Sequence, residues 1–172
     1  MTEVVPDTKD WTWVLDRPCP ECGLEAGTLG VGEVAGRLRA ATAAWTGVLA
    51  RTDVRVRPSA QVWSPLEYAC HVGDVLRLYD ERLRLMLEQD DPGYANWDQD
   101  GTAVRDAYAG QDPAAVAAQL QQAGATLAER FDGVRGQQWE RPGRRSDGAR
   151  FTVASFSRYL LNDVEHHLHD VA

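Results

Sequence analysis

The sequence predicts an all-α protein, an antiparallel four-helix bundle over residues 31–172 preceded by an irregular segment over residues 1–30. Four long stretches repeat apolar residues at steps of three and four, which is the spacing of one helix face. Three of these stretches open on a helix-start signal, and no two stretches show the alternation of paired strands. Long amphipathic helices without strands bury their apolar faces against one another, so a bundle follows.

The helices are predicted over residues 31–51, 64–89, 112–131 and 152–172. The second has the strongest start signal, with Ser64 as cap, Pro65 at the first helical position and Glu67 three residues after the cap. Thr152 is the predicted cap of the last helix, with Phe151 and Phe156 packed across it. The connections, including polar loops over 91–111 and 132–151, are uneven, which indicates at least one crossover.

Residues 1–30 are broken up by proline and glycine and contain the pair Cys19 and Cys22. Trp11, Trp13 and Leu15 alternate with polar residues, which predicts a short extended piece packed on the bundle. One Cys-x-x-Cys is half of a zinc knuckle, but the sequence has no second one. A thioredoxin-type pair is expected between a strand and a helix. A local turn with two thiols is therefore favoured over a metal or redox site.

The charge balance limits the kinds of partner that the protein is expected to bind. The 172 residues carry 18 Lys and Arg against 26 Asp and Glu, a formal net charge of −8. An acidic chain is not expected to bind nucleic acid, and no apolar run is long enough for a membrane span. Residues 1–7 do not resemble a secretory signal, so we expect a cytoplasmic protein. The basic stretch 141–150 is expected to be a solvated loop rather than an anion site.

Four histidines carry the functional signal, and three of them lie in the last predicted helix. Residues four apart project side by side from a helix, so such a pair can supply two metal ligands. Three pairs have this spacing: Asp163 with His167, Asn162 with His166, and Glu165 with His169.

The helical wheel favours the pair of Asp163 and His167, which lies at the edge of the apolar stripe. Asn162 and His166 are predicted to face water, and the third pair lies on the opposite flank. On the second helix, His71 would supply a third ligand from across the bundle. Two histidines and a carboxylate leave a coordination position open, as catalytic metal sites do.

Two further carboxylates are candidate catalytic residues that act through the ligands. Asp170 follows His167 by one turn and can accept its free ring N–H, while Asp74 follows His71. Cys70 is predicted to be a small core residue. Trp97 and Tyr94, in the loop 91–111, are candidate walls of a pocket.

The stretch Trp63-Ser64-Pro65-Leu66-Glu67-Tyr68-Ala69-Cys70-His71-Val72-Gly73-Asp74 resembles the W-S-x-x-E-x-x-x-H-(L/V)-x-D signature of the DinB-like superfamily, which carries a metal-binding histidine. The last helix resembles the second motif of that superfamily. This motif is H-x-x-x-H with a later Gln in the DinB branch, and E-x-x-x-H with a later Asp in the mycothiol-dependent maleylpyruvate isomerase branch. Asp163, His167 and Asp170 fit the register, with Asp163 one methylene shorter than the usual Glu.

The resemblance implies a four-helix bundle that binds a divalent metal, zinc or nickel, and acts on a small molecule. Its members include S-transferases and isomerases that use a low-molecular-weight thiol as cosubstrate. Three alternatives stay open beside that function. They are a metal-dependent hydrolase, a bundle that binds a metal or small molecule without catalysis, and an interaction module that forms a homodimer through an apolar helix face.

Overall fold

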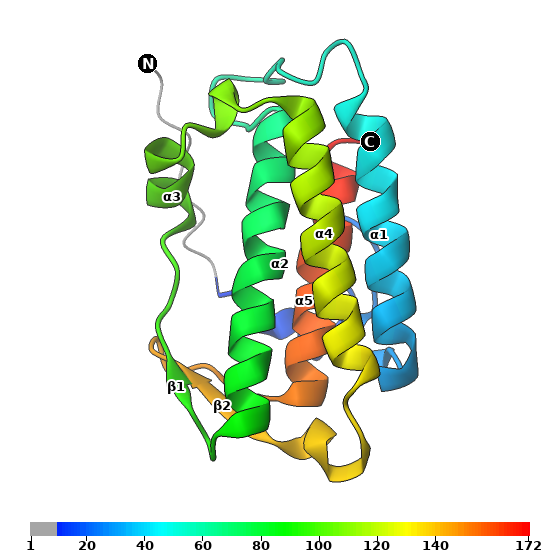
Figure 1. The fold of residues 1–172 in the computed structure, drawn as a ribbon, viewed down its shortest axis with the longest axis vertical. Coiled ribbons are helices and arrows are strands. Elements are labelled where there is room, and N and C mark those ends of the chain that lie inside the picture. Colours follow the sequence, from blue (N-terminus) through cyan, green and yellow to red (C-terminus); the bar gives the residue numbers. More distant parts are fainter. Residues whose placement is uncertain (1–9) are drawn as a thin grey trace.

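The computed structural model describes residues 10–172, and its framework is a bundle of four long helices. Helix α4 packs against both α1 and α2, and α5 packs against the same two helices (Figure 1). The prediction of an all-α four-helix bundle is confirmed. None of the helices in the described residues combines the length and apolar character of a membrane span. The bundle helices are α1 (Val34–Leu49), α2 (Pro65–Glu88), α4 (Pro113–Asp132) and α5 (Val153–Asp170).

The helix directions do not alternate around the bundle. In Figure 1, α1 and α5 run upward, whereas α2 and α4 both run downward. The neighbours α2 and α4 are therefore parallel, as are α1 and α5, so the bundle is antiparallel only in part. A parallel pair requires a connection that returns along the length of the bundle. Residues 89–112 form this crossover, as the uneven connections predicted.

The two long connections contain short elements that the sequence pattern did not predict. Strand β1 (Gly93–Tyr94) pairs in parallel with β2 (Pro142–Arg145), which pairs antiparallel with β3 (Arg150–Thr152). The crossover also holds the short helix α3 (Gln99–Arg105). Strands of two to four residues are too short to show a clear alternation, which explains why both segments were expected to be loops. The basic stretch 141–150 is thus a hairpin.

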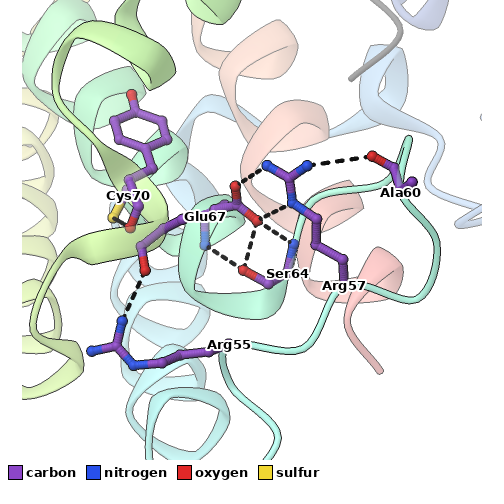
Figure 2. A network of polar contacts seen from close by, with 8 residues as sticks. Arg55, Arg57, Ala60, Ser64, Glu67 and Cys70 are labelled. Atoms are coloured by element: carbon purple, nitrogen blue, oxygen red, sulfur yellow. Dashed lines mark hydrogen bonds and ion pairs between the residues drawn. The ribbon is translucent and has the colours of Figure 1, made fainter. Parts of the chain in front are cut away.

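The helix starts follow the sequence signals. Ser64 accepts a hydrogen bond from the Glu67 backbone N–H, and the Glu67 carboxylate accepts from the Ser64 N–H and hydroxyl, each at 2.8 Å. The Arg57 guanidinium donates to the same buried carboxylate, as Figure 2 shows. Asp112 and Thr152 cap α4 and α5 by the same type of contact. The glutamate of the second-helix motif therefore anchors the start of α2.

The core lies between the four helices and is built from large apolar side chains. Trp45 of α1, Leu76 of α2 and Leu120 of α4 are almost completely buried. Phe156 of α5 stacks on Tyr79 of α2, with ring centroids 4.4 Å apart. Helices α1 and α4 approach closely at Gly124, where an added Cβ would lie 2.3 Å from Thr42 Cγ2. This contact leaves no room for a side chain at position 124.

The N-terminal segment contains three short 3-10 turns, of which η1 (Thr12–Leu15) and η2 (Ala26–Thr28) pack on α5, while η3 (Val31–Glu33) contacts α1. Val14 and Ala26 anchor it and are completely buried. The expected extended piece is a 3-10 turn instead, and packing of the segment on the bundle is observed. Residues 1–9, including the stretch assessed for a secretory signal, lie outside the described residues.

Candidate metal centre

His71 of α2 and Asp163 and His167 of α5 converge on one point between their helices. The His167 Nε2 lies 3.0 Å from Asp163 Oδ1, and the His71 Nε2 lies 3.9 Å from the same oxygen. One donor atom from each residue lies within 4.8 Å of the other two. Tetrahedral coordination of zinc would place such nitrogen and oxygen atoms roughly 3.4 Å apart. The two measured distances bracket that value, so the donor set fits a divalent cation in both chemistry and spacing.

Asp170 orients one of these ligands. The Nδ1–H of His167 donates to Asp170 Oδ2 over 2.8 Å, which turns Nε2 toward the cluster. Burial opposes charge on His167, but hydrogen bonds to Asp163 and Asp170 outweigh it and raise the pKa of His167 to about 9. Burial likewise disfavours the Asp163 anion, yet hydrogen bonds from the two histidines hold its pKa well below the usual range. A carboxylate behind a histidine ligand is a common feature of metal sites.

Two tryptophans fix the ring of His71. The indole of Trp97, in the crossover, stacks on it with centroids 5.3 Å apart and an interplanar angle of 14°. Trp63 contacts it at 5.4 Å, just before α2 begins. Burial lowers the pKa of His71, which favours the neutral form that can bind a metal. The Nδ1 of His71 is buried and, among the described residues, has no hydrogen-bond partner.

The cluster opens into a cleft of about 820 Å³, a volume typical of small-molecule sites. Its walls come from the N-terminal segment, the start of α2 and the residues before it, the crossover, the β2–β3 hairpin and α5. Of the described residues that line it, Arg145 alone is an arginine or lysine, whereas the acidic residues are numerous. The acidic residues are Asp10, Glu21, Asp98, Asp100, Asp147, Asp163 and Asp170.

The other candidate ligands have different positions. Glu165 accepts two hydrogen bonds from Arg37 of α1, at 2.8 and 2.7 Å, and so joins α5 to α1. His169 is exposed. Asn162 is buried and lines the cleft, and its Oδ1 has no partner among the described residues. The pair of Glu165 and His169 is therefore not assembled as a site.

Asp74 does not line the cleft that contains His71. It accepts a hydrogen bond from the Tyr108 hydroxyl and pairs with Arg77 at 2.5 Å. These residues border a separate, smaller cleft on the other side of α2. Cys70 is buried beside this second cleft, as its predicted role as a small core residue requires. Asp74 therefore faces the second cleft and not the cleft that contains His71.

His166 is buried, which corrects the expectation that it faces water. A helical wheel shows only which side of α5 is apolar. In the fold, the N-terminal segment covers the polar side that carries His166. The His166 Nδ1 lies 3.6 Å from Cys19 Sγ, and the Trp11 ring packs on the imidazole with centroids 5.5 Å apart. Two histidines adjacent in sequence thus belong to different clusters.

Sequence reasoning missed the contribution of the hairpin to the cleft. Arg145 was assigned to a solvated loop, but it is mostly buried, pairs with Asp147 at 2.9 Å and is hydrogen-bonded to Tyr159. Of the two aromatic wall candidates, Trp97 lines the cleft, while Tyr94 is buried in the core. No local pattern marks Arg145, because its position depends on the pairing of β2 with β1.

Comparison with known proteins identifies the family. The structure is similar to that of YfiT from Bacillus subtilis, with a TM-score of 0.63 and 18% sequence identity over 97% of this chain and 89% of YfiT. YfiT is described as a probable metal-dependent hydrolase with an unusual four-helix bundle topology. No curated protein matches the chain. The family model of the DinB superfamily matches residues 35–171, which is most of the sequence, and the chain belongs to the DinB superfamily.

Proposed function

We propose that the chain is an enzyme that uses a divalent cation, held by His71, Asp163 and His167, to act on a small molecule in the cleft. The convergence of these three donors from two helices supports the proposal. Bound there, a zinc or nickel ion would act as a Lewis acid that activates a thiol or a water molecule as a nucleophile. Asp170 holds His167 in the tautomer that the ion requires, and Trp63 and Trp97 hold His71.

The lining of the cleft favours a neutral or cationic substrate. Carboxylates accept hydrogen bonds from hydroxyl and ammonium groups and repel anions. The single guanidinium, that of Arg145, is already paired with Asp147. The aromatic rings of Trp63, Trp97 and Tyr68 supply apolar surface between the carboxylates. This combination suits a neutral, hydroxyl-rich molecule better than an acidic one.

We assign thiol-dependent S-transfer or isomerisation as the reaction class, with a low-molecular-weight thiol as cosubstrate. The spacing of Asp163, His167 and Asp170 supports this class, since it matches the E-x-x-x-H-x-x-D motif of the thiol-dependent branch with Asp163 in place of the glutamate. Metal-dependent hydrolysis is the second candidate, favoured by the likeness to YfiT. The two classes differ in the nucleophile, which is a thiol in the first and water in the second.

The experiment compares both reactions on the protein reconstituted with zinc or nickel. Consumption of thiol by S-transfer is followed with the neutral electrophile 1-chloro-2,4-dinitrobenzene, and hydrolysis with p-nitrophenyl acetate. The proposal expects metal-dependent turnover with neutral mycothiol that exceeds turnover with acidic glutathione, and loss of this turnover in His167→Ala. Metal-dependent ester hydrolysis without any use of thiol would assign the second class. Equal rates with and without metal would refute both.

A further inference from the structure

Cys19, Cys22 and His166 form a second cluster of metal-ligating side chains, separate from the donors of the cleft. Their donor atoms all lie within 4.8 Å of one another. Cys19 is 1% exposed and His166 is 7% exposed, while Cys22 is partly exposed. We propose that Cys19, Cys22 and His166 bind a zinc ion that fastens the N-terminal segment to the end of α5.

The spacing of the donors matches tetrahedral zinc. Zinc–sulfur and zinc–nitrogen distances near 2.3 and 2.05 Å place the sulfur and nitrogen atoms roughly 3.6 Å apart. The observed distance between Cys19 Sγ and His166 Nδ1 is 3.6 Å. Two sulfurs and one imidazole nitrogen form a soft donor set that selects zinc over magnesium or calcium. The third donor is supplied by tertiary packing, 144 positions beyond Cys22, so a search for a second Cys-x-x-Cys could not reveal it.

The loop between the cysteines is shaped to present both sulfurs to one side. The Gly23 N–H donates to the Cys19 carbonyl at 2.8 Å, and the Cys19 N–H donates to the Leu24 carbonyl at 2.9 Å. Gly23 has φ of +75°, a left-handed conformation that favours glycine and lets the chain reverse directly after Cys22. This closed turn needs no disulfide, and all three cysteines are free.

The second ring nitrogen of His166, Nε2, lies close to two carboxylates. The His166 Nε2 lies 3.5 Å from Asp170 Oδ1 and 3.4 Å from Glu21 Oε2. A carboxylate on the second ring nitrogen fixes the tautomer in which Nδ1 is free to bind a metal. The site therefore has three protein ligands with orienting contacts behind the histidine. His166 packs against Trp11, which lines the cleft. A zinc ion bound by His166 would therefore stabilise one wall of that cleft.

Cobalt substitution tests this site on the full chain. The reduced, metal-free protein is titrated with cobalt, which gives a near-ultraviolet sulfur-to-cobalt charge-transfer band only when a thiolate is a ligand. The band is expected in the wild type and in His71→Ala, and it is expected to be absent from Cys19→Ser and Cys22→Ser. Cys70→Ser is the matched control, because the third cysteine lies elsewhere and should leave the band unchanged. Because His71→Ala removes a ligand of the cleft alone, failure of one site is distinguishable from failure of the other.

Hydrogen exchange provides a readout that does not depend on the cobalt spectrum. Zinc is expected to slow exchange of the Cys19 and Gly23 amides at least about 10-fold in the wild type and to leave them unchanged in Cys22→Ser. A reduced wild-type protein without the charge-transfer band would overturn the proposal. Loss of the band in Cys70→Ser would do the same, since it would assign the thiolate to another place.

Discussion

His167 donates its Nδ1–H to Asp170 over 2.8 Å, and its Nε2 faces Asp163 at 3.0 Å. The second oxygen of Asp170 lies 3.5 Å from the Nε2 of His166. One carboxylate therefore orients two consecutive histidines that turn toward different clusters. Asp170 acts through these rings and makes no contact with His71, so it is a positioning residue.

Replacing Asp170 with Asn tests this orienting role. The loss of a carboxylate behind a histidine ligand typically lowers metal affinity about 10- to 100-fold. We expect this decrease for zinc at the cleft site, with the stoichiometry restored at higher zinc concentration. Competitive titration in a Cys22→Ser background isolates the cleft site. Asp132→Asn, at an exposed pair with Arg39, is the control, and an equal affinity in both variants would exclude the role.

Histidine substitutions distinguish the two clusters. His167→Ala should remove zinc binding at the cleft site, because it removes one of three donors. His169→Ala should leave both sites intact, since its ring is exposed. His166→Ala should abolish the sulfur-to-cobalt band and retain zinc in the cleft. Metal analysis of the three proteins checks this pattern, and loss of cleft zinc from His166→Ala alone would favour the register with Asn162.

Glu67 makes a pH-dependent contribution to stability. Burial would raise the pKa of Glu67, but hydrogen bonds from Arg57 and Ser64 lower it below the ordinary value of 4.5. The stabilisation is therefore complete at neutral pH, decreases as the pH falls below 4.5, and is lost as the pH passes through the lowered pKa. Glu67→Gln should reduce the free energy of unfolding by about 2 kcal/mol at pH 7.

The difference between wild type and Glu67→Gln should then shrink as the pH is lowered. Urea unfolding at several pH values measures it. Glu88→Gln, at an exposed pair with Arg84, is the control and should change stability by less than about 1 kcal/mol. A difference that grows toward acidic pH would contradict the assigned direction of the pKa shift.

Gly124 tests the close approach of α1 and α4. Alanine there gains about 1 kcal/mol of helix propensity but places its Cβ against Thr42, and overpacking costs about 1–3 kcal/mol. We expect a lower Tm for Gly124→Ala. Gly47→Ala, in open space on α1, should keep or raise the Tm. Calorimetry of the two variants compares them directly, and an increase in both would mean that Thr42 yields without cost.

The sequence predicts the helices, and the side-by-side placement of Asp163 and His167 on one of them, because both depend on local spacing. The positions of Asp163 and His167 follow from one helical turn, and the cap at Ser64 depends on its neighbours Pro65 and Glu67. These relationships lie within a few residues and do not depend on the rest of the fold.

The burial of His166 and the place of Arg145 follow instead from contacts between distant segments. The N-terminal segment covers the face of α5 that the wheel assigned to water, and short strands bring the hairpin to the cleft. The position of Asp74 also depends on contacts that its spacing in the sequence does not reveal. Its spacing from His71 suggested a shared site, but Tyr108 and Arg77 hold its carboxylate at the second cleft.

Zinc titration by calorimetry in the Cys22→Ser background tests most directly whether His71, Asp163 and His167 form a metal site. This background retains all three donors and removes a ligand of the second cluster. The expected result is one zinc ion bound per chain, with binding lost when His71→Ala is added on the opposite helix. The absence of binding in Cys22→Ser, or binding that persists unchanged after His71→Ala, would contradict the metal site.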